Sequence, residues 1–140
     1  ILAGGSTARP PDVNPLQTLL NRYGRREDHP FVQRVLRFEM QRAAFRLTQR
    51  RTVEESDDGQ TPGPQTSIFE LVGAQLEIEE AEIKSESAGT SGLGWEGDGF
   101  SATELHNTRD WLSIKRRAIA RGSNEVQRNI IAKRVLGLPD

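Results

Sequence analysis

The sequence predicts an all-α protein, folded as an antiparallel four-helix bundle. Apolar residues recur at helical spacing in several stretches, and segments rich in glycine and proline separate these stretches. No stretch of useful length alternates apolar and polar residues in the way that a half-buried strand does. One long helical stretch is rich in arginine and the next is rich in glutamate, so the two are expected to pack as antiparallel neighbours.

The first helix is expected to start at Asn14-Pro15 and to end at Gly24, because proline suits a first helical turn and glycine stops a helix. The glycines and prolines of residues 1–11 predict a flexible start of the chain. We therefore divide the chain into residues 1–24, an N-terminal segment with a remnant of the first bundle helix, and residues 25–140, the bundle domain.

The next two helices are the longest that the pattern predicts. Asp28-His29-Pro30 marks the start of one that reaches about Thr52, and its polar side is rich in arginine. An acidic connection over residues 54–65 follows, with a turn at Thr61-Pro62-Gly63-Pro64. The third helix covers about residues 68–86, and its solvent side is acidic. Exposed ion pairs stabilise a fold by only about 0 to 1 kcal/mol each, so the apolar stripes must supply most of the packing energy.

The remaining chain predicts a loop and two further helices. Glycines recur through residues 87–100, which excludes a stable helix there, and Trp95 is expected to pack against the body of the protein. A helix is predicted from Ala102 to Ile119. The last helix starts after Gly122, where Ser123 or Asn124 can cap it, and Gly137 and Pro139 end it.

Composition excludes several classes of function. The 140 residues hold 19 Lys and Arg against 20 Asp and Glu, so there is no basic field for nucleic acid or an anionic membrane. No cysteine is present, which excludes disulfides, thiolate zinc sites and a cysteine nucleophile. His29 and His106 are isolated, so no metal site is expected. No apolar run of about 18 residues predicts a membrane span, and we expect a cytoplasmic protein.

The last helix carries a family resemblance. Gly122-Ser123-Asn124-Glu125-Val126-Gln127-Arg128-Asn129 resembles the motif that opens the final helix of acyl-CoA dehydrogenases, and the ending Leu136-Gly137-Leu138-Pro139 is similar to that of bacterial members. The turn at residues 62–68, the glycine-rich loop and Arg109-Asp110-Trp111-Leu112 extend the resemblance over about residues 25–140. It implies the C-terminal four-helix bundle of a flavin-dependent enzyme of fatty acid or lipid metabolism, whose N-terminal helical and middle β domains complete the site.

The resemblance also implies the cofactor and its contacts. FAD is the expected cofactor, with Gly122, Ser123 and Glu125 beside it. Glu86 stands where many members have a flavin-contacting glutamine, although Gly89-Thr90 replaces the paired glycines that follow. The Arg-x-x-Phe-Gly motif that holds the FAD diphosphate is not evident near Tyr23-Gly24.

The implied reaction oxidises an acyl-CoA thioester to the α,β-enoyl-CoA. A carboxylate base removes the α proton, and in one branch of the family this base immediately precedes the glycine of the last motif. Here that position holds Arg121, which stays protonated and cannot act as the base. Arg121 is instead expected to face the substrate. In another branch of the family the base comes from an earlier helix, whose place would be just upstream of Ile1. Since the chain reads as part of a longer protein, we expect the base there and none in this segment. The isolated segment is then inactive.

Three hypotheses stay open at this point. The first is the bundle of such a dehydrogenase, with an electron-transfer flavoprotein as its electron acceptor and a homo- or hetero-oligomer as its assembly. The second is a non-catalytic scaffold subunit of a hetero-oligomeric dehydrogenase, which Arg121 and the absent diphosphate motif favour. The third is a helical protein-interaction module that uses its arginine-rich or glutamate-rich face.

Overall fold

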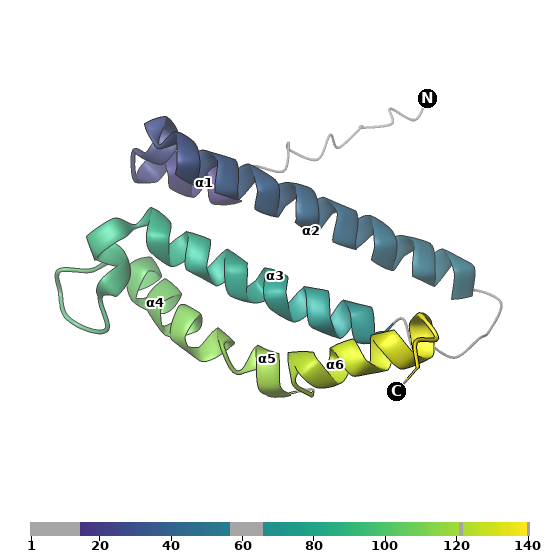
Figure 1. Cartoon of the computed structure of the whole chain (residues 1–140). Helices are drawn as coiled ribbons and strands as arrows, with labels where there is room; N and C mark the ends of the chain where they lie inside the picture. Colours follow the sequence, from purple (N-terminus) through teal and green to yellow (C-terminus); the bar gives the residue numbers. More distant parts are fainter. Residues whose placement is uncertain (1–14, 57–65, 121, 140) are drawn as a thin grey trace, which may run out of the picture.

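The protein is built as three layers of helices with α3 in the middle. The computed structural model describes residues 15–56, 66–120 and 122–139. One side of α3 (Thr66–Ser87) is covered by α2 (His29–Ser56) (Figure 1). Along its other side run three consecutive helices: α4 (Ala102–Ile114), α5 (Arg117–Ala120) and α6 (Asn124–Ile130).

The fourth member of the bundle is short. Helix α1 (Pro15–Arg22) packs against α3, and the 3-10 helix η1 (Arg25–Glu27) joins α1 to α2. The described residues contain no strand, so the predicted all-α bundle is confirmed. The described part of α1 has 8 residues, so within the described residues it covers only one end of the α2–α3 pair.

Asp28 explains where α2 starts. Its carboxylate Oδ1 accepts a hydrogen bond of 3.2 Å from the backbone N–H of Phe31, which satisfies one of the free N–H groups of the first turn. Pro30 occupies this first turn, where its missing N–H costs nothing. The predicted start at Asp28-His29-Pro30 is therefore confirmed, and α2 continues to Ser56, past the expected end at Thr52.

The side-chain contacts show that α2 and α3 are antiparallel. Arg34, near the start of α2, lies 2.5 Å from Glu86 and 3.3 Å from Glu82, near the end of α3. Phe45, towards the other end of α2, meets Phe69 near the start of α3, edge to face with ring centroids 5.9 Å apart. The predicted pairing of an arginine-rich face with an acidic face is confirmed. Since these ion pairs are part-exposed, they fix the register more than they stabilise the fold.

The main apolar core lies where α1, α2 and α3 meet. Phe38 of α2 and Ile83 of α3 are each only 1% exposed. Full burial of one such side chain is worth roughly 1.5 to 3 kcal/mol, so this cluster holds α1 and the two long helices together. The cluster consists of seven buried side chains: Leu16, Leu20, Phe31, Val35, Phe38, Leu76 and Ile83.

The opposite side of α3 is packed through small residues. The backbone carbonyl of Gly92, in the 3-10 helix η2 (Gly89–Leu93), accepts hydrogen bonds from Ser85 Oγ at 3.1 Å and Thr108 Oγ1 at 3.0 Å. A Cβ atom at Gly92 would stand 2.1 Å from the carbonyl oxygen of Ser85. Only glycine allows this approach, which ties η2 to both α3 and α4.

Two sequence predictions about this side are wrong in detail. The helix expected over residues 102–119 is interrupted between α4 and α5. There the Arg116 N–H donates to the Ser113 carbonyl and the Ala118 N–H donates to the Lys115 carbonyl, so the backbone makes a tighter turn than an α-helix. Trp95 does not pack against the body, since it is 55% exposed. Its indole ring is instead covered by the guanidinium of Arg109, 5.4 Å from the ring centroid.

The last helix ends as the sequence predicts, with one irregularity. After α6 the backbone forms a π-helical turn, η3 (Ile131–Val135), in which the Leu136 N–H bonds the Ile131 carbonyl at 3.0 Å. Gly137 follows with φ of 65°, a left-handed conformation that glycine adopts at no steric cost. The predicted connection over residues 54–65 is described only to Ser56, where α2 ends, and its turn lies outside the described residues.

Candidate functional site

The turn before α6 brings together three of the predicted site residues. Gly122 has φ of 93°, and a Cβ atom there would stand 3.2 Å from the side-chain Nε2 of Gln127. Ser123 follows as the N-cap, and its hydroxyl accepts the Val126 N–H at 3.4 Å. The left-handed backbone angle favours glycine at residue 122, and a side chain there would also press on the Gln127 amide. Arg121, the predicted substrate-facing residue, lies outside the described residues.

Glu125 is a charged, accessible group in this turn. Its side chain is 74% exposed and lies 3.7 Å from Arg128. The pKa of Glu125 is held below its ordinary value, chiefly by a hydrogen bond from its own backbone N–H and then by one from the Ser123 hydroxyl. The carboxylate is therefore ionised at neutral pH, and it can accept hydrogen bonds but cannot donate a proton.

Sequence reasoning missed one residue of the turn, Gln127. This side chain is only 8% exposed, and it lies beneath Gly122 on the side that faces the bundle. Its Nε2 stands 3.2 Å from the place that a Cβ atom of residue 122 would take, so the Gln127 side chain packs directly beneath the turn. The only sequence signal was its place within the motif of residues 122–129.

Glu86 lies at a different place, near the end of α3. It is paired with Arg34 and borders a hollow of about 460 Å³ at the end of the bundle. Two buried nitrogens of the lining, Arg25 Nε and Trp111 Nε1, have no hydrogen-bond partner among the described residues. The hollow is lined by Arg25, Arg34, Glu82, Ser85, Glu86, Gly89, Leu93 and Trp111.

The structure does not bring Glu86 together with the Gly122–Glu125 turn. Arg117 of α5 binds Glu77 of α3 with its Nη2 2.9 Å from Oε1, which places the start of α5 level with Glu77. Glu86 lies nine residues further along α3, or about 13 Å at the rise of an α-helix. The turn follows α5 in the direction away from Glu86. The predicted contacts thus form two locations on the surface of the bundle.

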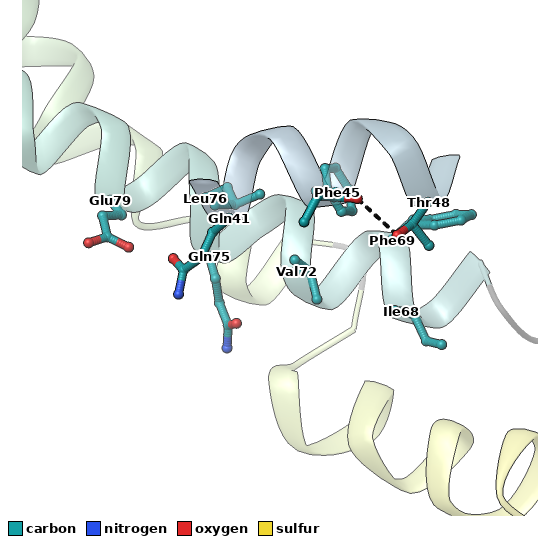
Figure 2. A pocket seen from close by; sticks show the side chains of 10 residues that line it. Gln41, Phe45, Thr48, Ile68, Phe69, Val72, Gln75, Leu76 and Glu79 are labelled. Atoms are coloured by element: carbon teal, nitrogen blue, oxygen red, sulfur yellow. Dashed lines mark hydrogen bonds between the residues drawn. The ribbon is translucent and has the colours of Figure 1, made fainter. Parts of the chain in front are cut away.

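A second hollow, which the sequence did not indicate, opens between α2 and α3 at the end that α1 leaves uncovered. It measures about 520 Å³, and Figure 2 shows Phe45, Phe69, Val72 and Ile68 along it. Polar side chains, among them Gln75, line its rim. The apolar walls suit an apolar side chain or ligand better than a charged one.

Two other kinds of site find no support in the described part of the chain. Over these ranges no group of three or more His, Asp or Glu side chains could hold a metal ion. None of the described helices is both long and apolar enough to cross a bilayer.

Comparison with known proteins places these features in a family. The model of the acyl-CoA dehydrogenase C-terminal domain matches residues 21–136. The chain is 40% identical over 82 residues to the acyl-CoA dehydrogenase IpdE1 of Mycolicibacterium smegmatis, and the aligned region covers 59% of this chain and 20% of that protein. It is 31% identical over 127 residues to the acyl-CoA dehydrogenase FadE34 of Mycobacterium tuberculosis, and this alignment covers 90% of this chain and 17% of that protein.

The chain spans about a fifth of the length of these curated relatives. No solved structure matches it. The family match covers most of the chain, from the end of α1 through α6 and η3, and it includes both the Gly122–Glu125 turn and Glu86. The chain therefore belongs to the acyl-CoA dehydrogenase family and contains its C-terminal helical domain.

Proposed function

We propose that this chain is the C-terminal part of an FAD-dependent acyl-CoA dehydrogenase that oxidises an acyl-CoA thioester to the α,β-enoyl-CoA. The observation that carries the proposal is the family match over residues 21–136, which includes the turn with the family's Gly-Ser-x-Glu residues, where Gly122 and Glu125 are exposed. The domain boundary at residue 25 belongs to the same proposal, as do an oligomeric assembly and an electron-transfer flavoprotein as electron acceptor.

The Gly122–Glu125 turn has the chemistry that a flavin dinucleotide requires. Gly122 is exposed and carries no side chain, so a ligand can approach the backbone there. The Ser123 hydroxyl, which donates to Glu125 and accepts from Val126, keeps one lone pair that can accept from a ring N–H. The ionised Glu125 can accept from a ribose hydroxyl or a ring N–H. These three residues would hold the cofactor in the complete enzyme.

Glu86 is less free to bind a cofactor than the residues of the Gly122–Glu125 turn. Its carboxylate is already bonded to Arg34, but the side chain is 47% exposed and keeps acceptor capacity. Ribose hydroxyls or an amino group are ligands that this carboxylate could accept from, whereas a phosphate would be repelled. We therefore assign Glu86 to a neutral part of the cofactor.

Bound flavin would supply the acceptor for the hydride that leaves the β carbon. Within this chain, the backbone N–H of Arg121 is proposed to donate to the thioester oxygen, which makes the α proton more acidic. The guanidinium of Arg121 stays protonated, so the base comes from outside these 140 residues. The 140-residue segment alone is proposed to be inactive, and turnover by it would contradict this division of roles.

Flavin retention by the complete protein tests the assignment of the turn. Ser123→Ala and Glu125→Gln should each lower the amount of FAD that co-purifies, as read from the visible absorbance of the flavin. Ser113→Ala and Glu96→Gln remove the same groups from exposed positions elsewhere and should leave the flavin content unchanged. Equal flavin content in all four variants would contradict the assignment.

A second candidate function is a non-catalytic scaffold subunit of a hetero-oligomeric dehydrogenase. The observation that favours it is the arginine at residue 121, where one branch of the family has its base, together with the absent diphosphate motif near Tyr23-Gly24. The complete protein would then fold and associate with a partner subunit but purify without flavin.

A further inference from the structure

The short helix α5 leads the chain from α4 into the Gly122–Glu125 turn. It has 4 residues and lies between two irregular stretches of backbone, the tight turn after α4 and Gly122 with its φ of 93°. A helix this short is not stable through its own backbone hydrogen bonds, because ordering a first helical turn is unfavourable. Contacts with the rest of the bundle must therefore fix where α5 lies.

Apolar burial holds α5 only weakly. None of its four side chains is buried, and Ile119 is 73% exposed. Ala118, Ile119 and Ala120 are apolar, so their side chains cannot form hydrogen bonds. Of the four residues of α5, only Arg117 has polar side-chain atoms with which to bind another helix.

Arg117 binds Glu77, near the middle of α3, with two hydrogen bonds. Its Nη2 donates to Oε1 at 2.9 Å, and its Nε donates to Oε2. Two bonds between planar groups fix the relative orientation of the partners as well as their separation. The pKa of Arg117 is raised above its ordinary value, first by its hydrogen bond to Glu77, so the guanidinium stays protonated.

We propose that the Arg117–Glu77 pair positions the Gly122–Glu125 turn, and that the pair thereby sets how tightly the complete enzyme holds its flavin. The turn follows α5 on one side, and on its other side α6 packs against the same helix α3, with Gln127 buried. Both ends of the turn are thus held by α3. Arg117 is a positioning residue, since it acts on the cofactor only through the turn. The proposal rests on the proposed function, which assigns the cofactor to this turn.

Loss of the pair should loosen the turn without unfolding the bundle. The Arg117 side chain is 30% exposed and that of Glu77 is 44% exposed, so solvent screens the pair and its share of the total stability is small. The same interaction matters more for the local opening of α5, which has little apolar contact to hold it closed. Because only the closed turn can bind the cofactor, a larger open fraction weakens the apparent affinity for flavin.

Amide hydrogen exchange and FAD titration of the complete protein test the proposal together. The N–H groups of Ala120 and Gly122 donate to backbone carbonyls of residues 116 and 119, so their exchange reports the opening of α5. Arg117→Gln should speed this exchange about two- to fivefold, the range that loss of one partly exposed ion pair allows. It should also raise the FAD dissociation constant of the flavin-free protein, by at most the same factor. Unchanged exchange, or unchanged affinity in a protein that binds FAD, would overturn the proposal.

Reversing the two charges separates positioning by the ion pair from simple packing of the arginine side chain. Arg117→Glu alone sets two carboxylates against each other and should give the fastest amide exchange and the weakest FAD binding. Adding Glu77→Arg restores opposite charges across the same contact, so both values should return towards those of the wild type. Packing lost with the arginine side chain would not be recovered in this way. Failure of the doubly reversed pair to recover either value would therefore refute the role of the ion pair.

Lys115→Gln is the matched control. Lys115 binds Glu82 of the same helix α3, but it is the C-cap of α4 and precedes the break before α5. Glu82 keeps a second partner in Arg34, 3.3 Å away. This variant should leave amide exchange in the turn and FAD affinity unchanged. An effect equal to that of Arg117→Gln would assign the loosening to any ion pair on α3 and would overturn the specific role of Arg117.

The two measurements also separate this proposal from the proposed function. If the complete wild-type protein binds no FAD, the proposed function fails, and amide exchange then shows by itself whether the pair holds the turn. If the wild type binds FAD but the affinity is the same in Arg117→Gln, the positioning role fails and the proposed function stands. Helix content by circular dichroism shows that each variant folds.

Discussion

The glycine at residue 92 offers the sharpest test of how the small-residue side of α3 is packed. An alanine at this position would put its Cβ 2.1 Å from the backbone carbonyl oxygen of Ser85, an atom that cannot move without shifting the end of α3. The Gly92 carbonyl would also be displaced from the hydroxyls of Ser85 and Thr108. Both effects destabilise the fold.

The expected cost follows from these contacts. Forcing an extra methyl group into a packed site costs about 1 to 3 kcal/mol, and each of the two lost hydrogen bonds adds about 1 kcal/mol. Gly92→Ala should therefore lower the free energy of unfolding by about 3 to 5 kcal/mol. Gly99→Ala is the matched control, because no atom of the described residues lies within 4 Å of its Cβ position and its φ is not in the left-handed region.

Urea unfolding followed by far-ultraviolet circular dichroism measures the difference between these two variants. Both replace glycine by alanine, so the loss of conformational freedom in the unfolded chain is shared and cancels in the comparison. Gly99→Ala should unfold at or slightly above the wild-type urea concentration. If Gly92→Ala unfolds at the same midpoint and with the same slope as Gly99→Ala, the close approach of η2 to α3 is refuted.

Three further predictions test the core and the helix starts. Phe38→Ala should lower the free energy of unfolding by about 3 to 5 kcal/mol, because the ring is fully buried. Val53→Ala, at a 64% exposed position, should change the free energy of unfolding by less than about 0.5 kcal/mol in the same urea titration. The pKa of Glu104 is held below its ordinary value, first by the Ser101 backbone N–H and then by the Ser101 hydroxyl. The Glu104 carboxylate therefore stabilises the fold above the ordinary glutamate pKa, and this stabilisation is lost as the pH falls through the lowered pKa of Glu104. Glu104→Gln should therefore flatten the decline of the melting temperature over that acidic range, and an unchanged decline would exclude Glu104 as its source. Ser123→Ala removes the cap of α6 and should cost about 1 kcal/mol, with Ser123→Asp close to wild type as a check that capping is the cause.

The parts of the fold that the sequence predicted are those with strong local signals. Asp28-Pro30 and Ser123 cap helices through contacts within one turn, so their positions are visible without any tertiary information. The opposite charges of α2 and α3 also predicted their antiparallel pairing, which the contacts between Arg34 and Glu82 confirm. Local chemistry was sufficient in each case.

The parts that it did not predict depend on packing between distant residues. The apolar residues of α2 predicted a long helix, but not that Leu36 and Leu47 would be exposed while Val35 is buried. Trp95 was expected inside because tryptophan is large and apolar, yet Arg109 covers its ring at the surface. Helical periodicity gives the angle of a side chain around its own helix, but it does not show against which side of that helix another part of the protein packs.

The candidate site shows the same division. The Gly122–Glu125 turn was identified because its contiguous residues resemble a family motif. Gln127, buried beneath Gly122, was missed, and so were the hollows beside Glu86 and between Phe45 and Phe69. These features arise from residues that only the bundle brings together.

The visible absorbance of the complete protein, before and after addition of acyl-CoA esters, tests the proposed function most directly. The proposal predicts that the purified protein carries flavin and that at least one ester bleaches its absorbance, because reduction of the flavin accompanies oxidation of the thioester. A folded protein without flavin, in the absence of a partner subunit, would contradict the catalytic proposal and favour the scaffold function instead. A flavoprotein that no acyl-CoA bleaches would contradict the proposed substrate class.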